Sequence, residues 1–287
     1  TAKLLKLITV SSYGVTVRIH GLACPPLAEA IIGYSRYALK ETWRIAEEKG
    51  LRPLYGDTDS LFLDSASNKQ VEWLIKTVKE RFSLDLAVEK RYNLCVLPKA
   101  KKAYFGILPD GTPDVKGVTP IKSNSPKYVN NVFQQCVRAL STVKNQEEYE
   151  QSKRVIKEIV KKAIEDLKSR QVKLEDLTYT VRLYFDPNEK VTDMKTAAQQ
   201  YQCALQLIDA GKKLKRWDTV SFVKVKPFTY NGKTFTVKPA EFVKSLAEIN
   251  VDDYVRNLLN ALNQTFEPMG VKLEMGKETE ISRWLIS

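Results

Sequence analysis

The segment Leu54–Leu63, LYGDTDSLFL, constrains the fold of this chain more than any other stretch. Two apolar runs flank Gly-Asp-Thr-Asp, a pattern that predicts two strands joined by a tight turn. Because both flanks are strongly apolar, we expect this hairpin to be buried within a sheet. Asp57 and Asp59 would repel each other there unless a donor or a cation such as Mg²⁺ compensates them. Aspartate in a turn is common, so the motif alone is more often a solvated turn than a metal site.

Helical and strand-like patterns alternate up to about residue 124, and helical patterns dominate afterwards. We therefore expect an α+β fold with a domain boundary near residue 124, where a mainly helical second part begins. Asn68 is the expected cap of the third helix, and Asn-Gly at 231–232 predicts a hairpin turn. The expected helices span 5–14, 27–49, 68–82, 126–170, 194–209 and 252–266, and the expected strands 52–55, 60–63, 84–97, 102–108, 114–121 and 221–228.

The chain is basic, with a formal net charge of +12 and a pI near 9.3. Such an excess favours polyanionic partners, nucleic acid above all, because binding releases counterions. A solvated basic surface of a thermophilic protein, with both Lys and Glu enriched, explains the composition equally well. Charge alone leaves these two interpretations open.

Cysteine and histidine usage excludes several kinds of site. The four cysteines are far apart and show no CxxC pairing, which argues against a zinc site and a disulfide framework. A single histidine excludes a histidine-based triad or multi-histidine metal site within this chain. No run is long enough to cross a bilayer, and the N-terminus lacks a signal-peptide pattern. We expect a soluble, intracellular protein without membrane association.

Two further patterns combine basic and aromatic residues. In PKAKKAYFG, Lys99, Lys101 and Lys102 crowd the start of a predicted strand that continues with Tyr104. Such a stretch is usually a solvated edge strand, but beside a carboxylate hairpin it is suited to hold phosphates. Lys6 precedes Tyr13 by two helical turns, so the two share a helix face. They are either a snorkelling lysine and a tyrosine of the core, or a cation for a triphosphate and a ring for a base.

Three segments resemble signatures of the family B DNA polymerases. YGDTDS is similar to the family's motif C in the palm domain, and KLITVSSYG is similar to motif B on the fingers helix. KKAYFG resembles the family's Lys-Lys-x-Tyr strand and follows motif C at the expected distance. The three occur in the family's order over residues 1–130, and the remainder resembles the helical thumb more loosely. The general character is archaeal.

The resemblance implies a fold, a reaction and a set of site residues. Residues 1–20 would end the fingers, 21–124 would form the palm, an antiparallel sheet with packed helices, and 125–287 the thumb. The reaction would be template-directed addition of dNTPs to a primer 3′ end by two-metal phosphoryl transfer, with two Mg²⁺ ions. The implied metal ligands are Asp57 and Asp59, with Glu89 as an accessory acid. The implied nucleotide contacts are Lys6, Tyr13 and Gly14. The implied primer–template contacts are Lys101, Lys102, Tyr104, Lys116, Lys122, Lys212, Lys213, Lys215 and Arg216.

The sequence also departs from the family pattern. Val10 stands where the family usually has Asn, and VTVRIHG lacks the second glycine expected after Tyr-Gly. Motif A, with the other obligate metal-binding aspartate, belongs upstream of Lys6. We therefore expect a partner that supplies the N-terminal, exonuclease and motif A segments of the same polymerase, either linked or as a separate chain.

Other expectations concern context and the alternative function. A sliding clamp is a further expected type of partner, although EISRWLIS contains no clear clamp-binding peptide. The expected location is the cytoplasm of an archaeal cell, in association with the nucleoid. The alternative is a non-catalytic DNA-binding or scaffolding subunit that keeps the polymerase fold. A generic basic α+β binding module would require all three signatures to be coincidences.

Overall fold

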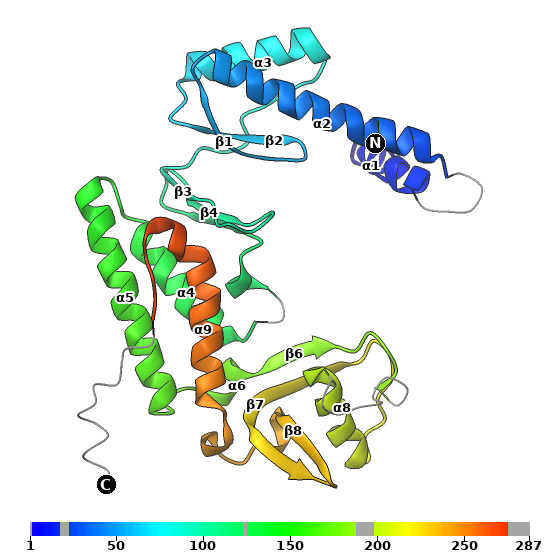
Figure 1. Cartoon of the computed structure of the whole chain (residues 1–287), viewed down its shortest axis with the longest axis vertical. Helices are drawn as coiled ribbons and strands as arrows, with labels where there is room; N and C mark the ends of the chain where they lie inside the picture. The colour runs from blue at the N-terminus through cyan, green and yellow to red at the C-terminus, as the bar shows by residue number, and fades with distance from the viewer. Residues whose placement is uncertain (1, 18–22, 123–124, 188–197, 275–287) are drawn as a thin grey trace. The chain divides into compact units, whose positions relative to one another are not determined.

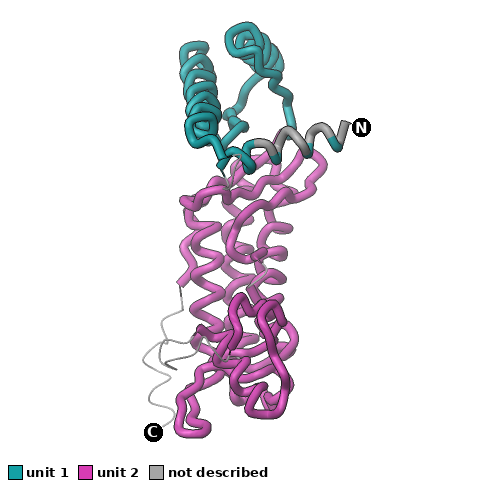
Figure 2. Tube along the Cα trace, turned by 90° about the vertical axis from the view of Figure 1, so that its right-hand side faces the viewer, with its two compact units in different colours: residues 1–90 teal, residues 91–287 magenta. Residues whose placement is uncertain are grey.

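The computed structural model describes residues 2–17, 23–122, 125–187 and 198–274. The chain forms two compact units, residues 1–90 and 91–287 (Figure 2). The first contains α1 (Ala2–Val17), α2 (Pro25–Glu48), β1 (Arg52–Asp57), β2 (Ser60–Asp64) and α3 (Asn68–Phe82). The second contains β3 (Leu94–Val96), β4 (Tyr104–Ile107), β5 (Pro113–Lys116), η1 (Thr119–Ile121), α4 (Lys127–Leu140), α5 (Gln146–Lys168), α6 (Leu174–Leu177), β6 (Tyr179–Arg182), α8 (Gln199–Asp209), β7 (Thr219–Tyr230), β8 (Lys233–Pro239), η2 (Ala240–Phe242), η3 (Leu246–Glu248), α9 (Val251–Phe266) and η4 (Glu267–Met269). None of the helices in these ranges has the length and apolar character needed to span a membrane.

Helix α3 shows how local sequence determines the first unit. Leu74, Val78 and Phe82 recur every fourth residue and are buried, as the helical spacing predicts. The predicted cap at Asn68 is wrong, because the N-cap is Ser67 and Asn68 is the first helical residue. The Ser67 hydroxyl accepts a hydrogen bond from the Gln70 amide, and the Gln70 side chain accepts one from the Ser67 amide, which forms a capping box.

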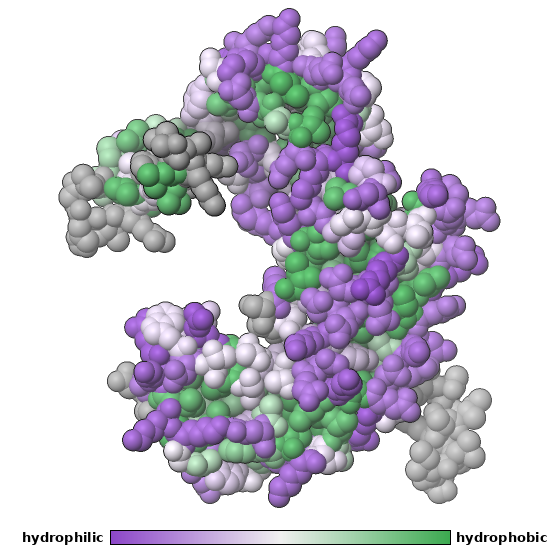
Figure 3. Space-filling model, turned by 180° about the vertical axis from the view of Figure 1, so that it is seen from behind, coloured by the Kyte–Doolittle hydropathy of each residue, from purple (hydrophilic) through white to green (hydrophobic). Residues whose placement is uncertain are grey.

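The β1–β2 hairpin forms as predicted, but in the described part of the chain it pairs with no third strand. The expectation of a hairpin buried within a larger sheet is therefore wrong for this structure. Its side chains are mostly half-buried, and Leu54 is 43% exposed. Figure 3 shows an apolar patch among hydrophilic side chains on the first unit. An apolar strand with a free edge is the kind of surface that a further strand or segment covers.

The second unit begins with the three-stranded antiparallel sheet β3-β4-β5, which packs on α4, α5 and α9. Helices α4, α5 and α9 run side by side (Figure 1). Phe105 of β4 contacts Phe133 of α4 and Phe266 of α9, with ring centroids 6.1 and 5.6 Å apart. The sheet and these helices therefore share one hydrophobic core.

The strand predicted over 84–97 is much shorter, since only Leu94–Val96 is extended in the sheet. Glu89, Lys90 and Arg91 are consecutive and all exposed, so this stretch cannot place alternate side chains in a core. The strand predicted over 114–121 ends at Lys116, and the 3-10 turn η1 follows.

A second sheet in this unit, β6-β7-β8, is antiparallel and packs against α8 around a separate core. Asn231 and Gly232, with φ of +49° and +72°, join β7 to β8. The predicted Asn-Gly hairpin turn is therefore confirmed. The fold is α+β, and its described ranges form three small antiparallel sheets with packed helices.

The two compact units meet at Lys90 rather than near the expected boundary at residue 124. The physical reason is the shared core, because strands β3 to β5 bury their apolar side chains against α4 and α9. The assignment of fingers, palm and thumb to residue ranges stays a prediction.

Candidate functional site

The carboxylate pair lies at the tip of the β1–β2 hairpin. Asp57 is opposite Ser60 in the register, so Thr58 and Asp59 form a two-residue turn. Thr58 adopts a left-handed backbone conformation, with φ of +57°. The Asp59 amide donates a hydrogen bond to the Asp57 carbonyl over 2.6 Å, and the Thr58 hydroxyl donates one to the Asp57 carboxylate over 3.1 Å. The turn holds Asp57 half-buried and leaves Asp59 exposed.

These carboxylates fit a hard divalent cation as part of a larger ligand set. Mg²⁺ takes oxygen ligands and usually keeps several waters, which an exposed turn allows. Glu89 is exposed in the irregular segment after α3. Across the described ranges, no three His, Cys, Asp or Glu side chains are grouped closely enough to hold a metal ion. The structure therefore does not group Glu89 with Asp57 and Asp59, and its role stays a prediction.

Helix α1 contains the residues expected to contact a nucleotide. Tyr13 is 37% exposed, and a Cβ added at Gly14 would meet no atom within 4 Å. The space beside the Gly14 backbone would allow a close approach, and its contact with a nucleotide stays a prediction. The side chains of Lys6 and Val10 lie outside the described residues, so the common face of Lys6 and Tyr13 stays a prediction.

The lysine-bearing strand has a precise backbone arrangement. Lys101 and Lys102 are exposed just before β4, and Lys102 is left-handed with φ of +58°. Gly117, with φ of +64°, passes so close that a Cβ there would lie 2.1 Å from the Lys102 carbonyl oxygen. Tyr104 is opposite Lys116, whose ammonium lies 5.6 Å from the Tyr104 ring centroid. Three of the predicted lysines therefore lie at one end of the β4–β5 pair.

Sequence analysis missed the contacts that fix Tyr104. The Tyr92 hydroxyl donates a hydrogen bond to the Asp114 carboxylate over 2.5 Å, and the rings of Tyr92 and Tyr104 meet edge to face at 6.3 Å. Burial, reinforced by the bond to Asp114, raises the pKa of Tyr92 well above its usual range. Only the register that places Asp114 opposite Gly106 brings these groups together, so the sequence contained no direct signal.

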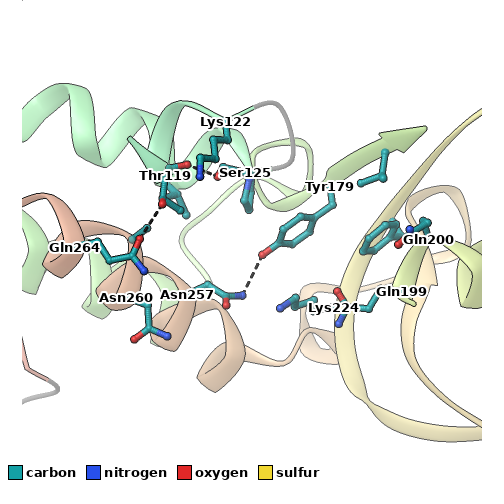
Figure 4. A pocket seen from close by; sticks show the side chains of 15 residues that line it. Thr119, Lys122, Ser125, Tyr179, Gln199, Gln200, Lys224, Asn257, Asn260 and Gln264 are labelled. Carbon is teal, nitrogen blue, oxygen red and sulfur yellow. Dashed lines mark hydrogen bonds between the residues drawn. The ribbon is translucent and has the colours of Figure 1, made fainter. Parts of the chain in front are cut away.

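Two cavities of about 520 Å³ each lie in the second unit and share Thr119, Lys122 and Gln264 in their linings. The first is lined by two lysines and five carboxamide side chains, and none of its described lining residues has a carboxylate (Figure 4). Its polar lining consists of Thr119, Lys122, Ser125, Tyr179, Gln199, Gln200, Lys224, Asn257, Asn260 and Gln264. The second is lined by Lys99, Lys101 and Lys122 together with one acid, Glu267. Lysines and amides without acids suit an anionic, polar ligand such as a nucleic-acid backbone.

In the first cavity, a hydrogen bond fixes Tyr179 in the lining, and the pKa of the lining residue Lys224 is lowered. The Asn257 amide donates a hydrogen bond to the Tyr179 hydroxyl over 3.1 Å. The Lys224 ammonium lies 5.5 Å from the Tyr179 ring centroid, and burial lowers the pKa of this lysine. Because Tyr179 also stacks on Phe222, with centroids 5.5 Å apart, its ring faces are covered and the cavity presents polar edges.

The basic cluster predicted in the thumb divides into two parts. Lys212 forms an ion pair with Glu241, at 2.5 Å. Lys213, Lys215 and Arg216 are exposed in the loop between α8 and β7. The sequence pattern grouped the four equally, but only a fold that places η2 beside the end of α8 reveals the pairing of Lys212.

The chain thus has a carboxylate pair at the tip of a hairpin, a lysine-bearing strand and lysine-lined cavities, which are groups that can bind metal ions and phosphates. Residues 2–269 match the family model described as DNA polymerase family B. The chain belongs to the DNA polymerase family B.

Individual relatives agree with this assignment. The chain is 33% identical over 270 residues to DNA polymerase 1 of Saccharolobus solfataricus. This alignment covers 93% of this chain and 29% of that protein. It is 30% identical to DNA polymerase 2 of Aeropyrum pernix, over 88% of this chain and 30% of that protein. The solved family B DNA polymerase of the hyperthermophilic archaeon Pyrobaculum calidifontis matches with a TM-score of 0.67 and 26% identity, over 94% of this chain and 34% of that one. The chain spans about three tenths of the length of its curated relatives.

Proposed function

We propose that this chain forms part of the catalytic centre of a DNA polymerase that adds dNTPs to a primer 3′ end on a template. The observation that supports this most is the turn with half-buried Asp57 and exposed Asp59, within a chain of family B. The fingers, palm and thumb ranges, the bound primer–template DNA and an archaeal cytoplasmic location near the nucleoid belong to the same proposal.

Asp57 and Asp59 would hold the divalent metal in this proposal. When bound, two Mg²⁺ ions would activate the primer hydroxyl and stabilise charge on the transferred phosphoryl group. The chain's own contribution is to orient these carboxylates at a rigid turn and to position the polyanion through Lys101, Lys102 and Lys122. Lysines supply point charges for phosphates, and the amide-lined cavity supplies neutral donors and acceptors.

The test is Asp59→Asn in the assembled polymerase. The amide keeps the shape but removes the charge, so we expect primer extension to be abolished and primer–template affinity to stay nearly unchanged. Asp85→Asn is the matched control, because Asp85 is an exposed acid of the same unit that pairs with Lys79 at 2.7 Å. Extension by the Asp59 variant at the rate of the control would refute the metal assignment.

The proposal also requires a further polypeptide segment. Two metal ions need ligands on more than one side, whereas Asp57 and Asp59 come from one turn. A segment corresponding to the part of the relatives that this chain does not span, with the motif A carboxylate and the exonuclease, would complete the set and cover the exposed side of the hairpin. We expect Mg²⁺-dependent extension only when this chain and that segment are present together, whether linked or separate. Robust synthesis by the 287-residue chain alone would contradict this requirement.

A non-catalytic DNA-binding or scaffolding role is the second candidate. It is favoured by the position of Glu89, which is not grouped with the hairpin carboxylates. In that case the assembled protein would bind primer–template DNA, and Asp59→Asn would change neither binding nor any synthesis that a partner performs.

A further inference from the structure

The second unit presents an exposed aromatic cluster that the proposed polymerase site does not use. Tyr184 is 54% exposed, and Phe185 and Trp217 are each 52% exposed. The rings of Tyr184 and Trp217 meet edge to face, with centroids 5.8 Å apart. We call Tyr184, Phe185 and Trp217 the aromatic platform. Large aromatic side chains gathered and exposed in this way mark binding surfaces.

The backbone holds the platform in place from both sides of Leu183. The Leu183 amide donates a hydrogen bond to the Asp218 carbonyl over 2.8 Å, and the Trp217 amide donates one to the Leu183 carbonyl over 2.7 Å. The Phe185 amide donates a hydrogen bond to the Tyr201 hydroxyl over 3.0 Å. Leu183 itself is buried, so the exposed rings stand on a fixed base.

Trp217 has an unfavourable backbone conformation. Its φ is +77°, a left-handed value that is uncommon for a bulky side chain and tends to occur where the surroundings impose it, often at functional sites. Burial does not explain the strain, because half of the side chain is exposed. Trp217 thus combines a left-handed backbone with a half-exposed ring.

In the described loop before β7, the exposed charged side chains next to Trp217 are positive. The Arg216 guanidinium lies 4.6 Å from the Trp217 ring centroid, and Lys213 and Lys215 are exposed in the same loop. Within the described ranges none of these three cations lies within 4 Å of a carboxylate. The nearby acids, Asp186 and Asp218, are half-buried, and the Asp218 carboxylate accepts a hydrogen bond from the Lys215 amide over 2.9 Å.

We propose that the aromatic platform and its flanking cations bind single-stranded nucleic acid, with unpaired bases stacked on Tyr184 and Trp217 and phosphates held by Lys213, Lys215 and Arg216. Aromatic rings beside a basic surface are the combination that binds single strands without sequence preference. A duplex fits less well, because its base faces are already stacked inside the helix. An apolar protein surface would leave the three cations without counter-charges.

The single-strand site rests on the proposed nucleic-acid contacts of Lys213, Lys215 and Arg216 and adds base stacking to them, so the test must separate base stacking from charge attraction. Trp217→Gly removes the ring and also relieves the left-handed strain, since glycine adopts positive φ freely; the fold should therefore survive. Tyr34→Ala is the matched control, because Tyr34 is 53% exposed on α2. The probes are a thymidine oligonucleotide and an abasic oligonucleotide of the same length and charge, with thermal unfolding as the check of folding.

We expect Trp217→Gly to weaken thymidine-oligonucleotide binding at least about fivefold, the lower limit for one stacked base. Binding of the abasic strand and the salt dependence should stay unchanged, and Tyr34→Ala should have no effect. Equal losses for both strands, or no loss for either, would overturn the proposal. Stronger binding of polyglutamate than of the oligonucleotide, with the same sensitivity to Trp217→Gly, would identify an acidic peptide site instead. Primer extension is a separate readout, so failure there would not affect this result.

Discussion

Gly117→Ala tests whether the close crossing of Gly117 and Lys102 sets the geometry of the lysine-bearing strand. Alanine would have to keep a φ of +64°, which costs about 1–2 kcal/mol for a residue with a Cβ. Its Cβ would also lie 2.1 Å from the Lys102 carbonyl oxygen and 3.3 Å from the Ala103 Cα. These are backbone atoms that cannot rotate away, so the strands must separate. We expect a total loss of about 3–4 kcal/mol in the free energy of unfolding, measured by denaturant titration.

Gly232→Ala is the matched control for this measurement. Gly232 has a φ of +72°, but a Cβ there meets no atom within 4 Å. Its substitution should cost only the backbone term of about 1–2 kcal/mol. The difference between the two variants therefore isolates the steric contact with Lys102. Equal losses at Gly117 and Gly232 would refute the close crossing, and so would a Gly117 variant with wild-type stability.

Two further predictions follow from burial and ion pairing. Cys136 and Cys203 are fully buried, and burial raises the pKa of each thiol to about 12. At pH 8, iodoacetamide should therefore label the exposed Cys24 and leave Cys136 and Cys203 unlabelled until the chain unfolds. Mass spectrometry of the peptides would show which cysteines are labelled. The hydrogen bond from Lys238, at 2.5 Å, lowers the pKa of Glu248. This stabilisation is present above the unfolded-state pKa of about 4.3 and is lost as pH falls through the lower folded-state value. Glu248→Gln should therefore destabilise the protein by less than about 1 kcal/mol at pH 7, and denaturant titrations should show that the difference disappears under strongly acidic conditions.

The parts of the fold that were predictable are those determined by neighbouring residues. The hairpin of Asp57 and Asp59, the α3 stripe of Leu74 and Val78, and the Asn231–Gly232 turn each depend on a few adjacent positions. The errors also have local causes. Ser67 and Asn68 are both good caps, and the reciprocal bonds with Gln70 decide between them. The segment around Glu89 resembled a strand in its apolar flanks, but its run of exposed charges prevents pairing.

The cavities could not be predicted, because they assemble from distant segments. Thr119 in η1 and Gln264 in α9 are 145 residues apart, yet the Thr119 hydroxyl donates a hydrogen bond to the Gln264 carboxamide over 2.8 Å. The contact of Tyr92 with Asp114 likewise depends on strand register. Motif resemblance identified which lysines to examine but gave no information on which side chains surround them.

The distribution of ion pairs separates the two interpretations that net charge left open. A solvated basic surface of a thermophilic protein intersperses lysine and glutamate, as Lys76–Glu80 and Lys161–Glu165 do here. Lys122 and Lys224 differ, because both line the first cavity and none of the described residues that line it has a carboxylate. Burial lowers the pKa of Lys224 even though Asp253 favours the charged form of that lysine, so an anionic ligand in the cavity would stabilise both cations. These two lysines therefore lie where a polyanion would compensate their charge, as the proposed binding of primer–template DNA requires.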